Sequence, residues 1–300
     1  MIPKVLVICG PTATGKTQLS FLLAKKFNGE IISADSRQVY KYMDIGTGKD
    51  KPEDDSIKIW GYDLVSPNEQ FSISHYQKFA KEKIEEIQKR NHLPILVGGS
   101  GLYIKAATEG IETASIKPDT VLRENLKDKT VEELVKILNN ADALRLQKMN
   151  MSDRNNPRRL IRAIEIAEST EERINEVKGY DLLFIGLTFS LTELEKKISV
   201  RVDERVRNGF QEEIKFLKEN NYWSGAPSVT LGYKQSLSAG TDKDWISKWK
   251  LEEFKYAKRQ ITWFKKDKRI NWFDVTDKNY EERVEKLVEK WYAQRNAKED

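Results

Sequence analysis

Residues 4–17, KVLVICGPTATGKT, decide the fold of this chain. The first six are an apolar run rich in Val and Ile, which is typical of a buried parallel strand. Residues 10–17 match the phosphate-binding pattern G-x-x-x-x-G-K-[ST] at every fixed position. Residues 16–27 then carry apolar side chains at helical spacing, so the strand–loop–helix context of the motif is present. The stretch therefore predicts a loop that holds a pyrophosphate.

Two glycines, Gly10 and Gly15, frame this loop and let its backbone approach a ligand without a Cβ clash. The N-terminus of the following helix faces the same anion as the loop amides. Lys16 can reach phosphate oxygens, and the Thr17 hydroxyl can bind Mg²⁺ or donate to phosphate. A glycine-rich turn that binds nothing is the alternative, and the strand–loop–helix context counts against it.

A carboxylate, Asp35, ends a second predicted strand, EIISAD at 30–35. At that place it can bind Mg²⁺, accept a nucleoside hydroxyl, or act as a general base toward a nucleophile within hydrogen-bond reach. The simpler alternative is that it caps a turn with Ser36. Glutamine is also a side chain that reads an adenine edge. The donors around Asp35 are Ser33, Ser36, Arg37 and Gln38.

Strands and helices alternate through the first third of the chain. Residues 58–65 are a third strand candidate, 76–90 have a helical pattern, and 94–99 form a strand that ends in glycines. This alternation predicts an α/β fold like that of the P-loop NTPases, a parallel sheet flanked by helices, with ligands at the carboxyl ends of the strands. At the last of these ends, Ser100 either caps a helix or offers its hydroxyl to a ligand.

The texture changes at about residue 113, where the chain becomes polar, charged and helical. Pro157 fits the first turn of one of these helices, because its missing N–H costs nothing there. Residues 180–190 then return to a strand, and from about residue 192 the chain is mainly helical up to a polar tail. We predict a helical insertion at 113–178 inside a core made of 1–112 and 179–300.

Arginines gather on two predicted helices. On each helix two of them are four residues apart and share a face, namely Arg158 with Arg162 and Arg201 with Arg205. A solvated basic face is one explanation; the other is neutralisation of a pyrophosphate or an RNA backbone. The chemistry of the residues does not separate Arg201 from Arg205. Arg159 and Arg207 complete the two clusters.

Residues 255–269 hold seven basic residues and one acid. Helical spacing places Lys255, Arg259 and Thr262 on one stripe, which suits phosphate contacts. The interleaved aromatic side chains can stack on bases, but we expect them to pack into the core. They are Tyr256, Trp263 and Phe264.

The composition sets further bounds. The net charge of +5 permits an acidic partner such as RNA. Cys9 is the single cysteine, so an internal disulfide and a cysteine-based zinc site are excluded, and we interpret it as a small buried residue. His75 and His92 form no metal-ligand pattern and are interpreted as structural or surface residues. We expect a cytoplasmic protein, because the first strand starts too early for a signal peptide and no apolar run is long enough for a membrane span. We expect it to be a monomer, although no motif bears on the oligomeric state.

Together these motifs resemble the tRNA dimethylallyltransferases, also called tRNA isopentenyltransferases, of the bacterial type. The resemblance covers nearly the whole chain and keeps the family's motif order. Its small departures, Thr14 and Ser100, retain the hydroxyl that the family pattern has there. The motifs are GPTATGKT (10–17), ISADSRQVYKYMDIGT (32–47), PILVGGSGLY (94–103), NPRRLIRAIE (156–165), RVDERV (201–206), GYKQ (232–235) and KRQITWF (258–264).

The resemblance implies a role for each motif. Thr17 and Arg205 would contact the diphosphate of dimethylallyl diphosphate, with Mg²⁺ bridging and Thr17 as a metal ligand. Asp35 would be the base on the 6-amino group of the adenosine just 3′ of the anticodon, and the partner would be the anticodon stem-loop. The implied diphosphate contacts are Thr12, Ala13, Thr14, Gly15, Lys16 and Thr17. The implied tRNA contacts are Asp35, Ser36, Arg37, Gln38, Ser100, Arg123, Asn156, Pro157, Arg158, Arg159, Leu160, Lys258 and Arg259.

Three other functions use similar parts. A nucleoside or nucleotide kinase shares the loop and the carboxylate, but it requires ATP. A GTPase-like RNA-binding module is disfavoured because no N-K-x-D string is evident. An enzyme that prenylates free adenine nucleotides is disfavoured by the helical insertion and the basic C-terminal third, which suit a macromolecular acceptor.

Overall fold

The structure is a computed structural model that describes residues 2–170, 179–237 and 242–294. Its chain contacts divide it into two compact units, Met1–Glu109 with Val177–Asp300, and Gly110–Glu176. We call them the core unit and the helical unit. Residues 171–178, where the predicted insertion ends, and the end of the polar tail, 295–300, lie outside the described residues.

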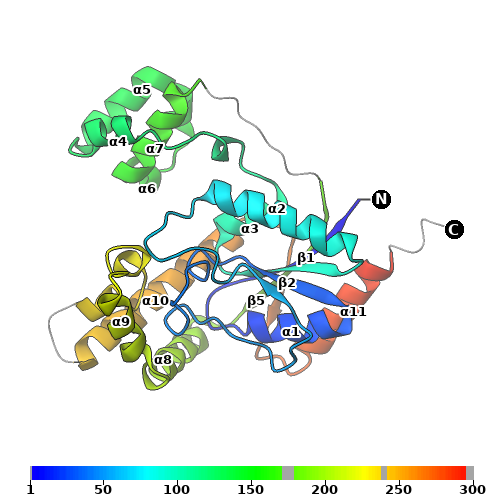
Figure 1. The fold of residues 1–300 in the computed structure, drawn as a ribbon. Coiled ribbons are helices and arrows are strands. Elements are labelled where there is room, and N and C mark those ends of the chain that lie inside the picture. Colours follow the sequence, from blue (N-terminus) through cyan, green and yellow to red (C-terminus); the bar gives the residue numbers. More distant parts are fainter. Residues whose placement is uncertain (1, 171–178, 238–241, 295–300) are drawn as a thin grey trace. The chain divides into compact units, whose positions relative to one another are not determined.

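The core unit is built on a six-stranded parallel sheet in the order β3-β2-β4-β1-β5-β6 (Figure 1). The central strand β1 pairs with β4 on one side and with β5 on the other, so Leu6 lies between Ile95 and Leu183. The predicted fold class is confirmed. The strands are β1 (Lys4–Cys9), β2 (Gly29–Ser33), β3 (Ile59–Trp60), β4 (Leu93–Gly98), β5 (Asp181–Thr188) and β6 (Ile270–Asp274).

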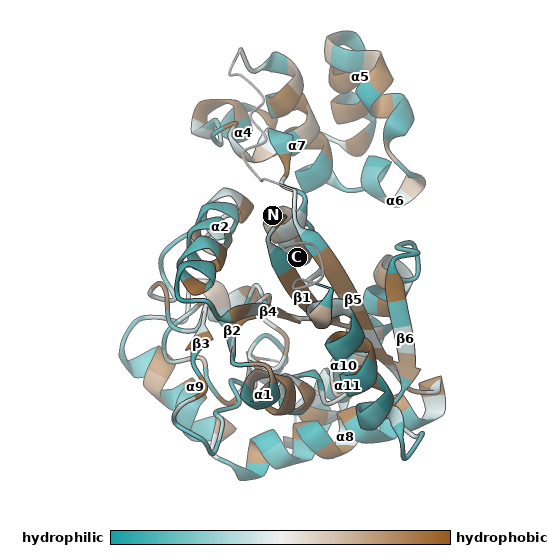
Figure 2. Ribbon diagram, turned by 90° about the vertical axis from the view of Figure 1, so that its right-hand side faces the viewer, coloured by the Kyte–Doolittle hydropathy of each residue, from teal (hydrophilic) through white to brown (hydrophobic). Residues whose placement is uncertain are grey.

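Helices cover both faces of the sheet (Figure 1). The apolar side chains of α1 and α11 form one core with alternate residues of the strands, such as Leu6, Ile8 and Ile185. α2 packs on β2 and β4, and α3 packs on α2. The strands are largely apolar in Figure 2, whereas the helices mix polar and apolar residues. The helices of this unit are α1 (Lys16–Lys26), α2 (Ile73–Lys89), α3 (Gly101–Thr108), α8 (Leu191–Arg207), α9 (Phe210–Glu219), α10 (Asp242–Phe264) and α11 (Tyr280–Ala293), with short 3₁₀ turns at Ala226–Val229 and Gln235–Leu237.

The structure corrects the strand prediction in two places. The predicted strand at 58–65 is limited to the two residues of β3, because Gly61 and Asp63 take positive φ angles of 98° and 55° directly after it. The edge strand β6 was missed, since the region after residue 192 was expected to be mainly helical. β6 pairs in parallel with β5, and it therefore extends the sheet by a contact between distant parts of the chain.

The helical unit holds α4 (Thr120–Leu126), α5 (Val131–Lys148), α6 (Met151–Arg154) and α7 (Pro157–Glu168), after a 3₁₀ turn at Glu112–Ala114. α5 and α7 pack on each other around a leucine-rich core that includes Leu134, Leu138 and Leu160. The predicted start of α7 is confirmed, with Pro157 in its first turn and Asn156 as the N-cap whose side chain accepts the Arg159 N–H.

The single cysteine is buried, and the two histidines make local polar contacts. Cys9 is fully buried in β1, and burial raises the pKa of its thiol to about 12. His75 completes the capping box of α2 with Ser72. His92 lies 2.7 Å from the Glu30 carboxylate. Among the described residues, no helix combines the length and the apolar composition needed to cross a bilayer.

Candidate active site

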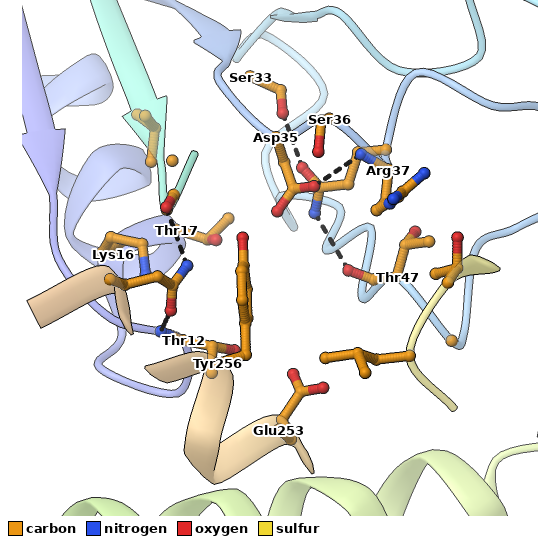
Figure 3. Close-up of a pocket in the computed structure, with 18 of the residues that line it drawn as sticks. Thr12, Lys16, Thr17, Ser33, Asp35, Ser36, Arg37, Thr47, Glu253 and Tyr256 are labelled. Atoms are coloured by element: carbon orange, nitrogen blue, oxygen red, sulfur yellow. Dashed lines mark hydrogen bonds between the residues drawn. The ribbon is translucent and has the colours of Figure 1, made fainter. Parts of the chain in front are cut away.

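A cavity of about 350 Å³ lies in the core unit, where β1, β2 and β4 end (Figure 3). The phosphate loop, the turn after β2, the turn after β4, and side chains of α8 and α10 form its walls. Among its lining residues are Thr12, Lys16, Thr17, Asp35, Gly99, Arg201, Arg205, Tyr256 and Gln260.

The phosphate loop wraps tightly and ends at α1. Gly15 has a φ of 78° and is followed by the first residue of the helix, Lys16. The Lys16 ammonium donates to the carbonyl of Pro11 at 2.6 Å, and the Thr14 hydroxyl donates to the same carbonyl at 2.9 Å. Burial, followed by the nearby Arg201, lowers the pKa of Lys16 to about 8. A bound anion would relieve this excess of positive charge.

Gly10 is required by the sheet rather than by a ligand. Its φ is 131°, and a Cβ built there would lie 2.4 Å from the carbonyl oxygen of Leu187 in β5. A Cβ at Gly15, by contrast, would meet no atom within 4 Å. At Gly15 the positive φ of 78° favours glycine, and the open space beside it leaves room for a ligand.

Both arginines of α8 that share a face line the cavity. Arg201 Nη1 donates to the Thr12 hydroxyl at 2.8 Å. Arg205 is only 8% exposed, lies 3.7 Å from a Glu253 oxygen, and stacks over the Trp249 ring. Its Nε has no hydrogen-bond partner among the described residues. Burial and Arg201 lower the pKa of Arg205 to about 10, so this guanidinium would also be stabilised by an anion.

Asp35 lies across the cavity from Lys16 and Thr17 (Figure 3). One of its oxygens accepts the Arg37 N–H at 2.8 Å, so the residue caps its own turn as well as facing the cavity. The neighbouring Ser36 N–H donates to the Ser100 hydroxyl at 3.2 Å. Ser100 holds the N-cap position of α3, but its side chain makes no cap bond and ties the two turns together instead.

The Gln38 amide is engaged by the protein on both sides. Its oxygen accepts from Ser33 at 2.7 Å, and its nitrogen donates to the carbonyl of Gly48 at 2.9 Å. Reading of an adenine edge by Gln38 would therefore have to exchange these bonds.

α10 contributes residues whose roles the sequence left unassigned. Gln260 is 5% exposed; its oxygen accepts the Thr12 N–H, and its nitrogen donates to the Gly99 carbonyl, each at 2.9 Å. It thus ties the phosphate loop to the turn after β4. Its place inside the quoted KRQITWF motif was the available signal.

The expected inward packing of the aromatic side chains of α10 is confirmed for Phe264 alone. Tyr256 lines the cavity, and Trp263 is 47% exposed beside Gly101. Of the two predicted basic contacts on this helix, Arg259 also lines the cavity, whereas Lys258 is exposed and lies over the Phe254 ring.

The predicted contacts in the helical unit form a separate group. Arg123 donates twice to the buried carboxylate of Glu165, at 2.7 and 2.9 Å, and so holds α4 to α7. Arg158 is exposed, Arg159 pairs with Asp153, and the Leu160 side chain is fully buried. A contact of RNA with Leu160 would have to use its backbone.

A sequence profile described as IPP transferase matches residues 38–267. The chain belongs to this family. A relative named tRNA dimethylallyltransferase from Finegoldia magna is 40% identical and covers 97% of this chain and 98% of its own. Among solved structures, the full-length tRNA isopentenylpyrophosphate transferase from Bacillus halodurans is 34% identical, with a TM-score of 0.73 and 99% of each chain covered.

A third similar protein is a eukaryotic dimethylallyltransferase, which crystallographic snapshots are described as showing acting on tRNA. It is 28% identical, with a TM-score of 0.84, and the match covers 97% of this chain and 80% of that one. Relatives of both kinds therefore share the arrangement of sheet and helices that forms the cavity.

Proposed function

We propose that this member of the IPP transferase family transfers a dimethylallyl group from dimethylallyl diphosphate to tRNA, at the 6-amino group of the adenosine 3′ of the anticodon. The names of its relatives support the group transferred and tRNA as the acceptor. The observation that carries the proposal is that one cavity holds a phosphate loop, two arginines and, across from them, the Asp35 carboxylate.

The cationic side of the cavity suits the leaving group. The bond between the allylic carbon and the diphosphate oxygen breaks, and the electron pair leaves with the diphosphate. Lys16, Arg201 and Arg205 meet the charge that develops there, together with the loop amides and the dipole of α1. These groups are already in place, so they need little reorganisation when the bond breaks.

Mg²⁺ fits this side of the site by the chemistry of its donors. The ion favours phosphate and water oxygens with few protein ligands, and the Thr17 hydroxyl offers such an oxygen beside the loop. Within the described parts of the chain, no group of three or more His, Cys, Asp and Glu residues could form a cage of protein ligands. When bound, Mg²⁺ would add positive charge at the diphosphate.

Asp35 serves the other reactant. An adenine amino group is a weak nucleophile, because its lone pair is delocalised into the ring. As its nitrogen bonds to the allylic carbon, it loses a proton, which Asp35 accepts. The adenine must leave its stack in the RNA to reach the cavity. The cationic side of the cavity and the Asp35 side work by holding the two reactants in line and by stabilising charge.

The RNA contacts belong to the same proposal. Ser36, Arg37 and Arg259 line the cavity and are placed to meet the nucleotides around the target base. The basic residues outside the cavity would contact the phosphates of the anticodon stem-loop. They are Lys258, Arg123, Arg158 and Arg159.

The test supplies unmodified tRNA, labelled dimethylallyl diphosphate and Mg²⁺, without ATP. We expect label in the RNA. Asp35→Asn should reduce kcat by roughly a hundredfold or more while tRNA affinity changes little, because only the base is removed. Asp55→Asn, an exposed aspartate outside the cavity, is the matched control. Full activity of Asp35→Asn would remove the base assignment, and a requirement for ATP would remove the proposed reaction.

Arg205→Ala separates the donor half-site from the RNA surface. Its partner in the proposal is the diphosphate, so we expect it to lower turnover more than tRNA affinity. A defect confined to tRNA binding would contradict its role.

A further inference from the structure

A carboxylate outside the cavity holds the loop that forms one of its walls. Glu213 lies in the first turn of α9. One of its oxygens accepts the N–H groups of Asp44 and Ile45, each at 2.7 Å, and the other accepts the N–H of Gly46 at 3.0 Å. Three consecutive amides thus point at one side chain, as they would at a bound anion.

A fourth donor binds the same carboxylate. The hydroxyl of Tyr233, which is fully buried, donates to Glu213 at 2.6 Å. The ring of Tyr233 packs edge-on against Phe210, the first residue of α9, with centroids 4.9 Å apart. The loop is pressed onto this pair, because a Cβ at Gly46 would lie 2.5 Å from both rings. Loop, tyrosine and helix are therefore packed together and joined by hydrogen bonds.

The far end of this loop, residues 46–48, lies beside both the two arginines and the turn that carries Asp35. Gly46 and Thr47 line the cavity. The next residue, Gly48, lies against the two guanidinium groups, since a Cβ there would be 2.5 Å from Arg201 and 2.6 Å from Arg205. Its carbonyl accepts the Gln38 amide, three residues from Asp35.

We propose that Glu213 is a positioning residue of the transfer reaction. By holding residues 44–48 it keeps the guanidinium groups of Arg201 and Arg205, and the turn that carries Asp35, at their working places. It touches no substrate itself. The inference rests on the proposed function, because it assigns those arginines to the donor's diphosphate.

The chemistry requires a carboxylate at this position. An ionised glutamate offers acceptors only, and four donors use them here. A glutamine of the same shape would turn an NH₂ group toward backbone N–H groups, so at least one amide would lose its partner. Glu213→Gln therefore loosens the loop with almost no change in volume.

Steady-state kinetics of the full chain with both substrates test the inference. For Glu213→Gln we expect kcat to fall and KM for dimethylallyl diphosphate to rise by about tenfold each, with KM for tRNA within about twofold of wild type. Isothermal titration with the diphosphate donor should show the same loss of affinity. Glu212→Gln removes the same charge from the exposed neighbouring position of α9 and should match wild type.

Three outcomes overturn the inference. The first is that Glu213→Gln keeps kcat and KM for the donor within about twofold of wild type. The second is that Glu213→Gln loses affinity for both substrates equally and also loses thermal stability, which would be a structural effect alone. If Glu213→Gln does not fold, Tyr233→Phe removes one of the four hydrogen bonds to Glu213 and should also raise KM for the donor. The third outcome is that Tyr233→Phe leaves this KM unchanged. A wild-type chain without transfer activity would instead sink the proposed function.

Discussion

Glu30, at the start of β2, is a carboxylate only 2% exposed in the core unit. Arg90 donates to it twice, at 3.0 and 2.8 Å, Trp60 donates at 2.7 Å, and His92 lies at the same distance. Burial opposes its ionisation, but the hydrogen bonds from Arg90, Trp60 and His92 outweigh burial and lower its pKa to about 2. The ionised form therefore stabilises this end of the sheet.

Glu30→Gln should lower the free energy of unfolding at pH 7 by roughly 3 kcal/mol. Because the pKa in the folded state lies below the ordinary value of 4.5, the contribution is full above that value and is lost as the pH falls toward 2. Urea unfolding at pH 7 and at pH 3 should show a smaller difference between variant and wild type at pH 3, where part of the contribution is already lost. The exposed Glu53 supplies the control, Glu53→Gln. An equal difference from wild type at both pH values would contradict the ion-pair account.

Lys16 makes binding of the diphosphate pH-dependent. Its pKa of about 8 in the free protein should rise when an anion binds. Above pH 8 the protein must then take up a proton on binding, and affinity should fall by up to about tenfold per pH unit. Titration calorimetry at pH 8.5 in buffers of different ionisation enthalpy measures this uptake. Lys16→Arg stays charged, so it should take up fewer protons on binding. Equal proton uptake by both proteins would contradict the role given to Lys16.

At the scale of elements, α10 joins the phosphate loop to the turn after β4 through the side chain of Gln260. Gln260→Leu keeps the volume but leaves the Thr12 N–H and the Gly99 carbonyl without their partner. Because each such loss costs about 1–3 kcal/mol, kcat/KM for the donor should fall by roughly ten- to a hundredfold. Ser247→Leu, at an exposed position of the same helix, is the control. Donor kinetics equal to those of wild type would show that α10 does not shape the loop.

For the whole molecule, the net charge of +5 and the basic clusters predict how tRNA affinity responds to salt. Each phosphate neutralised releases counterions, so even three contacts should weaken binding by more than about tenfold between 50 and 200 mM salt. Filter binding over that range measures the slope. Arg158→Ala, at an exposed site of the helical unit, should reduce it by about one contact. An affinity independent of salt would refute phosphate contact by these clusters.

Features that depend on neighbouring residues were predictable. The phosphate loop, its strand β1 and its helix α1 occupy the predicted places, because glycine positions and apolar spacing act over a few residues. The start of α7 at Asn156 and Pro157 follows from the same local rules. The alternation of strands and helices then sufficed for the fold class.

Features that depend on distant partners could not be predicted from the sequence. β6 is a short strand in a charged region, and only its pairing with β5 makes it part of the sheet. Periodicity places Tyr256 and Trp263 on a helix, but the packing of that helix decides that one faces the cavity and the other solvent. The links made by Gln260 and Glu213 join segments far apart in sequence.

The amino-acid sequence by itself determined the strand, loop and helix at residues 4–26, the parallel sheet and the family, because each rests on short-range backbone geometry or on an ordered set of motifs. The tertiary structure alone decided that Arg201 joins Arg205 at the cavity, that Arg123 binds Glu165, and that α9 and α10 support the loops of the site. Such contacts form only when distant segments pack together, and a linear pattern does not record which segments will meet.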